Sequence, residues 1–433
     1  MVIAIDLDWI TDSNVYGGVH QYALRLTHAL VKYSSETIVA IVSTDLSDFF
    51  SDLKQYSNFK LIIISDRYKF KYIIKEEEVD IIHRPIQAFD ITTFSVPMIN
   101  SLHDLQQFHY PEYFNDNELA WRETYYRGSA EFSERVIVSY QHVKDDIVKY
   151  YGIEPEKIDI CPVGMVEPQP VDSELYPAVK LKYDLPDRYL FYSAGTWRHK
   201  NHIGLIRALK VVRDQYGINI PLICTGCQYP DYFPEIERTI AELQLDNAVR
   251  FLGYVPDADM PLLLTNATMV VIPTLYEAGS YPLLEAMAYG VPVICSNVTS
   301  LPDSIGDSRF VFDPNNVDEM ARMIADMLRS PQLMVENTHN SSIRTQIGRW
   351  ESAVKEFLAS YERAIISFKN KKSKLYVDNF VALYDEEINL LKQQIAAEVE
   401  EKNNLRIQLS ELQNSIIFSP LCFIQKLIKY SKR

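Results

Sequence analysis

Two glutamates eight positions apart mark the segment of this chain with the clearest chemical content. Glu277 and Glu285 flank a loop of small residues, and the apolar run 268–274 precedes that loop. The β-branched run predicts a buried parallel strand, while Pro282 and the apolar residues 283–289 predict a helix. Glu277 is therefore expected at the carboxyl end of a strand, and Glu285 in the first turns of the next helix.

A strand, loop and helix N-terminus of this kind suit a ligand with both phosphates and hydroxyl groups. Backbone N–H groups and the helix dipole attract anions, and parallel α/β sheets bind ligands at the carboxyl ends of their strands. Two carboxylates would repel a bare phosphate, but they accept hydrogen bonds from hydroxyl groups. The segment indicates a nucleotide or nucleotide sugar. For either glutamate alone, an ordinary surface acid is the simpler interpretation.

Two other segments place candidate ligand-binding residues after predicted strands of the N-terminal part. Gly17 and Gly18 follow the first strand and precede a helix, where a diglycine lets the backbone approach a diphosphate closely. His103, with Asp104 beside it, ends the predicted strand 98–102. The alternatives are an ordinary turn with glycines and a structural histidine.

A basic turn follows the predicted strand 189–194. Arg198 and Lys200 stand in this turn and are placed to stabilise a departing diphosphate; for Arg198 a solvated basic turn is the alternative. Near the N-terminus, Asp6 and Asp8 imitate a metal-binding Asp-x-Asp motif, which we discount because they end the very first strand. No metal site is predicted.

Short apolar strands alternate with helical stretches twice along the chain, which predicts two α/β halves with parallel sheets. The expected linker between the halves is the proline-containing stretch 168–186. The predicted strands are 2–7, 37–43, 60–64, 79–83, 98–102, 135–139 and 158–163 in the first half, and 189–194, 221–225, 249–253, 269–273, 292–295 and 310–312 in the second.

The segment from Glu277 to Glu285 resembles the signature of glycosyltransferase family 4, and the resemblance extends over roughly residues 1–370. It implies the GT-B fold, an α/β architecture of two Rossmann-like domains facing a cleft. The implied domains are an acceptor-side domain, a nucleotide-sugar domain and a helix that returns to the first domain. Their expected bounds are 1–175, 176–349 and 350–370.

The same resemblance implies a role for each candidate residue. Glu277 and His103 would contact the donor sugar as catalytic residues, and Glu285 would contact the ribose. The family commonly has Gly-Phe-Gly where this chain has Ala278, Gly279 and Ser280. The residues expected to bind the nucleotide sugar are Gly17, Gly18, Arg198, Lys200, Gly279, Ser280, Tyr281 and Glu285.

The implied activity is retaining transfer of a hexose, with mannose as the favoured candidate, from a nucleoside-diphosphate sugar to a hydroxyl group. The acceptor would be a glycan or a lipid-linked sugar, as in bacterial surface polysaccharide synthesis, and no cofactor beyond the donor substrate is implied. Two other interpretations stay open. One is a non-catalytic GT-B scaffold for a partner transferase, and the other is a GT-B sugar-nucleotide epimerase.

The C-terminal region and the composition predict partners and location. Apolar residues with heptad spacing in 378–416 predict a coiled coil for self-association, or a long amphipathic helix on the globular body. The basic, bulky tail 417–433 fits an anionic membrane surface, a packing helix or a disordered tail equally well. A net charge of -15 argues against nucleic-acid binding. Five scattered cysteines and the absence of a signal sequence predict a cytoplasmic protein, at the inner face of the membrane if the tail binds lipid.

Overall fold

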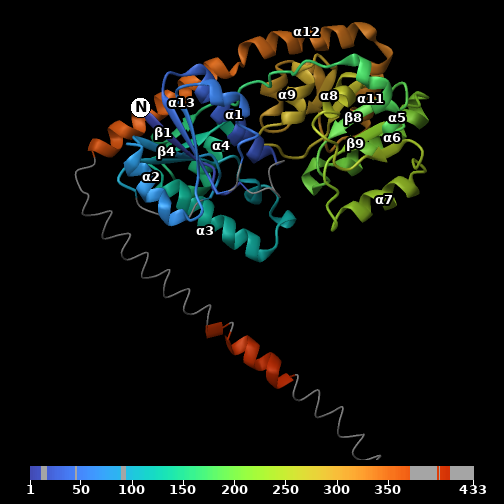
Figure 1. Cartoon of the computed structure of the whole chain (residues 1–433). Coiled ribbons are helices and arrows are strands. Elements are labelled where there is room, and N and C mark those ends of the chain that lie inside the picture. Colours follow the sequence, from blue (N-terminus) through green and yellow to red (C-terminus); the bar gives the residue numbers. More distant parts are fainter. Residues whose placement is uncertain (11–16, 44–45, 89–93, 371–396, 399, 410–433) are drawn as a thin grey trace, which may run out of the picture. The chain divides into compact units, whose positions relative to one another are not determined.

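The computed structural model describes residues 1–433 except 11–16, 44–45, 89–93, 371–396, 399 and 410–433. The chain divides into two compact units, Met1–Phe368 and Lys369–Arg433. The first unit contains two parallel sheets, one from each half of the predicted alternation (Figure 1). This is the two-domain α/β architecture that the sequence predicts.

The first sheet has seven strands in the order β3-β2-β1-β4-β5-β6-β7, and every pairing in it is parallel. Side chains of β1 alternate between the two faces of the sheet, because successive residues of a strand point in opposite directions. Ile3 and Ile5 pack on one face and Ala4 on the other. The strands are β1 Val2–Asp6, β2 Thr37–Val42, β3 Phe59–Ile63, β4 Ile81–Arg84, β5 Met98–Ser101, β6 Arg135–Val138 and β7 Ile158–Ile160.

The second sheet repeats this arrangement with six parallel strands in the order β10-β9-β8-β11-β12-β13. In both sheets the strand order reverses beside the first strand, and ligands of doubly wound sheets bind at the carboxyl ends next to that point. All thirteen predicted strands are present, with small shifts at their ends. The second set is β8 Leu190–Ser193, β9 Leu222–Thr225, β10 Val249–Phe251, β11 Met269–Ile272, β12 Val293–Ser296 and β13 Val311–Phe312.

Helices connect the strands and cover both sheets. Each contributes apolar side chains to the cores, as in α1, where Leu26 and Leu30 are fully buried. The helices of the first half are α1 Gly18–Tyr33, α2 Phe70–Glu76, α3 Asp116–Phe132 and α4 Gln141–Asp146. The later helices are α5 Tyr176–Lys182, α6 His202–Tyr216, α7 Phe233–Glu242, α8 Met260–Thr265, α9 Tyr281–Ala288, α10 Leu301–Ile305, α11 Val317–Arg329, α12 Pro331–Ile347 and α13 Trp350–Asn370.

The long helix α13 packs on the first half, although it follows the second half in sequence. Trp350, Val354, Phe357 and Tyr361 are buried and share one core with Ile3 of β1. Figure 1 shows α13 beside β1 and β4. The chain therefore crosses between the halves twice, before β8 and again before α13.

The predicted linker 168–186 requires a correction. It contains the short helix α5, which begins at Tyr176 and buries Val179. Pro177 occupies the first turn, where a proline removes no hydrogen bond and its fixed backbone angle favours a helix start. One of the four prolines in the predicted linker thus begins a helix.

Little of the second unit is described. Residues 397–398 and 400–409 are helical and exposed, and Leu405 and Leu409 of the predicted coiled-coil seam are 57% and 60% exposed. The rest of the predicted coiled coil 378–416 and the whole tail 417–433 lie outside the described residues. Self-association and membrane contact thus stay predictions.

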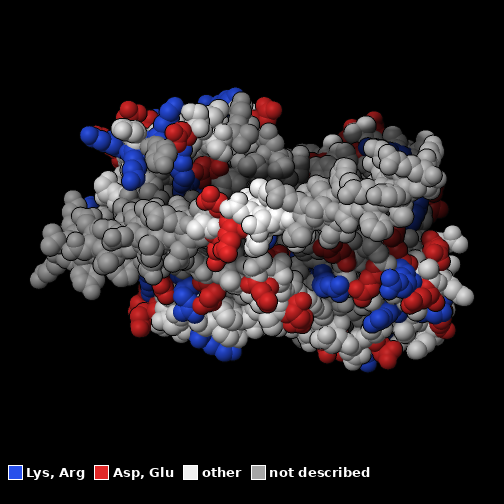
Figure 2. Space-filling model, turned by 90° about the horizontal axis from the view of Figure 1, so that it is seen from below, with Lys and Arg blue, Asp and Glu red and all other residues white. Residues whose placement is uncertain are grey.

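Two further observations concern the surface of the described residues. None of the helices they form is both long and apolar enough to cross a membrane. On the face seen in Figure 2, Lys and Arg side chains are interspersed with Asp and Glu side chains.

Candidate functional site

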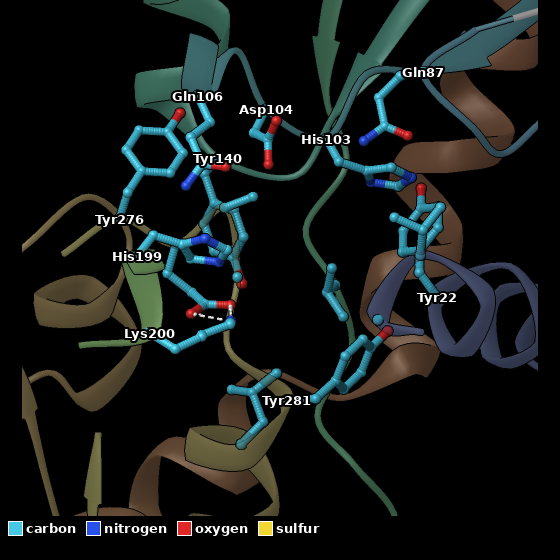
Figure 3. Close-up of a pocket in the computed structure, with 17 residues that line it drawn as sticks. Tyr22, Gln87, His103, Asp104, Gln106, Tyr140, His199, Lys200, Tyr276 and Tyr281 are labelled. Atoms are coloured by element: carbon cyan, nitrogen blue, oxygen red, sulfur yellow. Dashed lines mark hydrogen bonds and ion pairs between the residues drawn. The ribbon is translucent and has the colours of Figure 1, made fainter. Parts of the chain in front are cut away.

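A pocket lies between the two halves, where the carboxyl ends of the strands of both sheets meet (Figure 3). Its walls are built from the segments that follow β1, β4, β5, β6 and β7 in the first half and β8 and β11 in the second half. This is the expected location of a ligand in sheets of this topology. The residues that line it include Gly18, Tyr22, Gln87, His103, Asp104, Gln106 and Tyr140 from the first half, and His199, Lys200, Tyr276, Glu277, Gly279 and Tyr281 from the second.

Lys200 and Glu277 form an ion pair in this pocket. The Lys200 Nζ atom lies 2.8 Å from Oε1 and 2.7 Å from Oε2 of Glu277. The two side chains are 18% and 11% exposed, so the pair is largely shielded from solvent but open to the pocket. The Lys200 cation can bind a phosphate, and the Glu277 carboxylate beside it can accept hydrogen bonds from hydroxyl groups.

Hydrogen bonds fix the backbone on both sides of this pair. Asn201, in the left-handed region at φ 56°, donates from its side-chain amide to the carbonyls of Pro273 (2.9 Å) and Pro314 (3.1 Å). The hydroxyl of Thr299 donates to the Glu277 carbonyl at 2.5 Å. Asparagine tolerates the left-handed conformation better than most residues, which explains its position directly after Lys200.

Two helix N-termini contribute to the pocket. Gly17 caps α1 and Ser280 caps α9, and neither cap makes a side-chain hydrogen bond to its helix. The N-terminal residue Gly18 of α1 and Tyr281 of α9 both line the pocket. Since the first N–H groups of a helix have no partner within the helix, these termini supply hydrogen-bond donors and positive dipole ends for an anion.

The loop before α9 requires glycine because the first half approaches it closely. A Cβ atom on Gly279 would lie 2.7 Å from Cε2 and 2.8 Å from the hydroxyl of Tyr140, which belongs to the first half. Real side chains do not tolerate such contacts. The small residues of this loop thus allow the two halves to close over the pocket.

His103 is half-buried in the pocket wall and is uncharged near neutral pH. Burial lowers the pKa of its imidazole to about 4. Nε2 lies 3.4 Å from the Pro85 carbonyl, to which an N–H there donates, and the Tyr22 ring stands edge-on at 4.6 Å. In this tautomer Nδ1 is left as an acceptor for a hydroxyl group.

Glu285 contacts the facing half of the molecule. Its Oε1 atom accepts a hydrogen bond from Nη2 of Arg25 at 3.1 Å, and the Arg25 guanidinium lies over the Tyr281 ring at 4.7 Å. Burial raises the pKa of Glu285, and the charge of Arg25 opposes that effect. Arg25, on α1, thus joins the first half to the start of α9.

The remaining predicted residues lie outside the lining of the pocket. The Arg198 guanidinium lies over the Tyr232 ring at 4.4 Å, and its Nη1 atom is 3.2 Å from Glu235. Ser280 is buried at the start of α9. The predicted residues that do line the pocket are Gly18, His103, Lys200, Glu277, Gly279 and Tyr281, while Gly17, Arg198, Ser280 and Glu285 do not.

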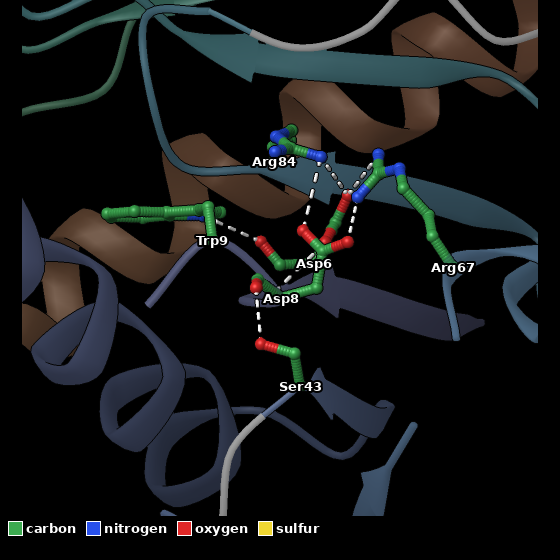
Figure 4. A network of polar contacts seen from close by, with 6 residues as sticks. All are labelled: Asp6, Asp8, Trp9, Ser43, Arg67 and Arg84. Carbon is green, nitrogen blue, oxygen red and sulfur yellow. Dashed lines mark hydrogen bonds and ion pairs between the residues drawn. The ribbon is translucent and has the colours of Figure 1, made fainter. Parts of the chain in front are cut away.

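The Asp-x-Asp motif at the end of β1 forms a separate ionic cluster (Figure 4). Asp6 Oδ2 is 2.9 Å from Arg84 Nη1 and 3.4 Å from Arg67 Nη2. Asp8 pairs with the same two arginines. No group of three or more residues suited to holding a metal occurs among the described residues. The motif is thus engaged with arginines.

Sequence reasoning missed several residues of the site. Arg25 and Tyr140 come from helices or turns whose sequence carries no signal of a ligand, and their place in the site depends on how the halves meet. Tyr276 directly precedes Glu277, and this position in the same strand-end loop was a signal that could have identified it. Asp104 also lines the pocket, although the sequence names it only as the neighbour of His103. Its position at the carboxyl end of β5 was a signal that could have identified it as a lining residue.

Two family profiles match the chain. The profile described as "Glycosyltransferase Family 4" matches residues 16–165, and the one described as "Glycosyl transferases group 1" matches residues 177–343. The first covers β2 to β7 of the first sheet, and the second covers β8 to β13 and the Glu277 loop. The two halves therefore match the two parts of one enzyme family.

Curated relatives have modest identity. The chain is 28% identical over 270 residues to "O-antigen chain mannosyltransferase B" of Escherichia coli, which spans 61% of this chain and 70% of the relative. It is 26% identical over 224 residues to the "MMP alpha-(1->4)-mannosyltransferase" of Mycolicibacterium hassiacum, covering 51% of this chain and 52% of the relative. With the second relative, the match thus spans only about half of its length.

Solved structures show the same fold. A glycosyltransferase of Rickettsia africae superposes with a TM-score of 0.64 at 17% identity, over 86% of this chain and 99% of that chain. HepE of Anabaena, solved with UDP and glucose, superposes with a TM-score of 0.62 at 18% identity, over 84% and 99%. These similarities establish the GT-B fold. Together with both family profiles, they show that the chain belongs to the group 1, family 4 glycosyltransferases and is a glycosyltransferase.

Proposed function

We propose that this enzyme is a retaining hexosyltransferase that moves a sugar from a nucleoside-diphosphate sugar to a hydroxyl group of a glycan or lipid-linked acceptor. The observation that carries this proposal is the pairing of Lys200 with Glu277 at 2.7 Å in a pocket that also receives the N-termini of α1 and α9. One side of the pocket can therefore bind phosphates and sugar hydroxyls at once.

The second half would hold most of the donor. Lys200 and the backbone N–H groups at the start of α9 stabilise the diphosphate, and the negative charge on it grows as it departs. Glu277 accepts hydrogen bonds from the sugar hydroxyls. His103, neutral and directed into the pocket from the first half, supplies a further acceptor for the sugar.

The ribose would be held by Glu285. In the structure this carboxylate is engaged by Arg25 of the first half. A bound ribose adds hydroxyl donors beside the same carboxylate, so that Glu285 either keeps both partners or exchanges Arg25 for the ribose. Either outcome couples donor binding to the contact between the two halves.

Transfer forms one bond and breaks one. The acceptor oxygen bonds to the anomeric carbon of the sugar, and the bond from that carbon to the diphosphate oxygen breaks with its electron pair on the leaving group. The proton of the acceptor hydroxyl passes to the leaving diphosphate. Lys200 stabilises the charge that develops before the proton arrives.

Mannose is the proposed sugar, and bacterial surface polysaccharide synthesis is the proposed setting. The support comes from relatives named as mannosyltransferases, including two of O-antigen chains, the second being RfbU of Salmonella typhimurium at 23% identity over 71% of its length. A neighbour of the same fold was solved with UDP and with UDP-glucose. Uridine donors must therefore be tested beside guanosine donors.

The test is a transfer assay on the purified full-length chain. GDP-mannose, UDP-glucose and ADP-glucose are supplied with a set of methyl hexosides, and both the glycoside product and the released nucleoside diphosphate are measured. We expect one donor to give a product of retained anomeric configuration. Glu277→Ala should abolish the product while nucleoside-diphosphate binding, followed by thermal shift, persists.

Three results would contradict the proposal. Equal turnover in wild type and Glu277→Ala would remove Glu277 from the site. Interconversion of the free nucleotide sugar without an acceptor would identify an epimerase. A folded wild-type chain that binds none of the donors would support a scaffold instead.

A further inference from the structure

Asp104 presents a carboxylate to the pocket from the side opposite the Lys200–Glu277 pair. It follows His103 at the carboxyl end of β5, and Figure 3 shows its side chain directed into the cavity. Among the described first-half residues that line the pocket, it alone carries a carboxyl group. The pocket therefore has one acidic side chain on each wall, Asp104 and Glu277.

The Asp104 carboxylate keeps capacity to accept hydrogen bonds. Its side chain is 25% exposed, and its nearest cation, Nη1 of Arg122, is 4.0 Å from Oδ1. That guanidinium is shared with other groups, because Nη1 also lies 3.4 Å from Gln107 Oε1 and the group stacks over the Phe114 ring at 4.2 Å. Asp104 thus has a weak ion pair and open space before it.

The electrostatic surroundings favour a neutral donor group as its ligand. Burial raises the pKa of Asp104, with Arg122, the Gln106 backbone N–H and Lys200 acting in the opposite direction. A phosphate would be repelled by this carboxylate. A hydroxyl group donates to it without bringing a second negative charge into the pocket.

His103 does not use Asp104 as its support. The Nε2 atom of its imidazole instead contacts the Pro85 carbonyl at 3.4 Å. The carboxylate next to it in sequence is therefore available to a substrate, rather than committed to fixing the imidazole.

We propose that Asp104 binds the attacking hydroxyl group of the acceptor sugar by accepting its hydrogen bond. This inference rests on the proposed function. The donor has its phosphate and hydroxyl partners in Lys200, Glu277 and the start of α9 on the second-half wall. The first-half carboxylate facing them is the group suited to the second substrate.

Asp104 acts here by orientation. A hydrogen bond from the acceptor O–H to the carboxylate aims an oxygen lone pair into the pocket, toward the donor held on the other wall. The proton still leaves with the diphosphate, so no additional acid or base is required. Loss of the carboxylate should therefore impair transfer to a sugar while leaving the donor site intact.

The test compares Asp104→Asn with wild type and with Asp145→Asn. The asparagine has nearly the same volume and lacks the charge. Asp145, an exposed residue of α4 that bonds Gln141 at 2.7 Å, provides a matched substitution in the same half. Each protein is assayed for nucleoside-diphosphate affinity, donor hydrolysis by water, and kcat/KM for the best methyl hexoside acceptor.

We expect Asp104→Asn to lower kcat/KM for the acceptor by about 100-fold, the lower end for loss of one positioned polar group at a reaction centre. Nucleoside-diphosphate affinity and donor hydrolysis should change less than about twofold, and Asp145→Asn should match wild type. Asp104→Glu, which keeps the charge but moves it, should recover part of the lost transfer.

Two results would overturn the inference. One is Asp104→Asn with wild-type acceptor kinetics. The other is a parallel loss of donor affinity and transfer, which would place Asp104 on the donor side. Failure of the proposed function looks different, because wild type itself would then release no nucleoside diphosphate from any donor, with or without an acceptor.

Discussion

Two clusters, each pairing acidic with basic side chains, lie at the carboxyl ends of central strands. They differ in what surrounds them. Asp6 and Asp8, at the end of β1, face Arg67 and Arg84 (Figure 4). Lys200, after β8, faces Glu277, after β11, in the pocket (Figure 3). The sequence motif is more conspicuous in the first cluster, yet only the second lies in the pocket.

The first cluster is closed. The side chains of Asp6, Asp8 and Arg84 are 1%, 9% and 9% exposed and only Arg67 is more accessible, at 31%, while two acids meet two bases. Buried charges of this kind must be paired, since an unpaired ion loses its hydration without compensation. The cluster therefore stabilises the packing around β1, and none of its four residues lines the pocket.

The second cluster is open. Its two groups retain 18% and 11% exposure, and two helix N-termini lie on the same pocket. A substrate can add contacts to both groups without breaking the backbone hydrogen bonds that hold them. The difference shows that charge at a strand end indicates function only where the opposite half of the molecule leaves space for a ligand.

Breaking the closed cluster should have the largest effect on stability. Asp6→Ala leaves Arg84 buried without its closest carboxylate, and we expect unfolding to become easier by about 3–5 kcal/mol. Urea denaturation measures this. Asp52→Ala, which removes a half-exposed acid beside Lys32, should cost less than about 1 kcal/mol. If Asp6→Ala and Asp52→Ala lowered the free energy of unfolding equally, the structural role of Asp6 would be contradicted.

Breaking the open cluster should affect binding more than stability. Lys200→Met removes the cation proposed to hold the diphosphate, and we expect a loss of about 10- to 100-fold in nucleoside-diphosphate affinity by titration calorimetry. Lys210→Met is the control, because Lys210 lies on α6 and pairs with Asp214. Unchanged affinity in Lys200→Met would exclude this lysine from the donor site.

Acid should weaken the first half through its buried histidines. Burial lowers the pKa of His83 to about 3 and of His103 to about 4, whereas an unfolded histidine titrates near pH 6.5. The unfolded chain thus binds more protons below about pH 6.5. Above that pH, burial of each neutral histidine contributes fully to the free energy of unfolding. As the pH falls from about 6.5 toward the folded pKa, this contribution decreases by about 1.4 kcal/mol per pH unit for each histidine.

Urea denaturation at pH 7, 6 and 5 checks this slope. His103→Gln should reduce it by about the share of one histidine, because glutamine does not titrate. A pH-independent free energy of unfolding between pH 7 and 5 would show that these imidazoles are not buried as described.

The smallest effect concerns a neutral chain of hydrogen bonds between α13 and the pocket wall. Tyr361 bonds His83 Nδ1 at 2.7 Å, His83 Nε2 bonds Ser101 at 2.9 Å, and Ser101 bonds the pocket residue Tyr22 at 2.9 Å. Tyr361→Phe removes one link and should cost about 1 kcal/mol in urea denaturation. If Tyr361→Phe were as stable as wild type, the hydrogen bond between Tyr361 and His83 would contribute nothing to stability.

Much of the fold could be predicted from local patterns. The alternation of apolar strands with helices placed every strand of both sheets, because buried parallel strands are continuous apolar runs. Strand ends and small-residue loops also located Gly18, His103, Lys200 and Glu277, all of which line the pocket. These predictions rest on information within a few residues of each position.

What could not be predicted depends on contacts between distant segments. The Arg25–Glu285 contact and the close approach of Tyr140 to Gly279 exist only because two halves meet in one particular way. Arg198 stands two positions before Lys200, but Tyr232 and Glu235 hold its side chain outside the lining of the pocket. No pattern within the basic turn distinguishes these two cations.

The most direct test of the role of Glu277 compares two single variants, Glu277→Gln and Asp6→Asn. Sugar transfer per folded molecule is measured for each variant at a temperature where its folded fraction is known. We expect Glu277→Gln to fold like wild type and to lose transfer by at least about 100-fold. Asp6→Asn should melt at a lower temperature but transfer at the wild-type rate per folded molecule. Full activity in Glu277→Gln, or lost transfer in fully folded Asp6→Asn, would contradict the assignment of function to the open cluster.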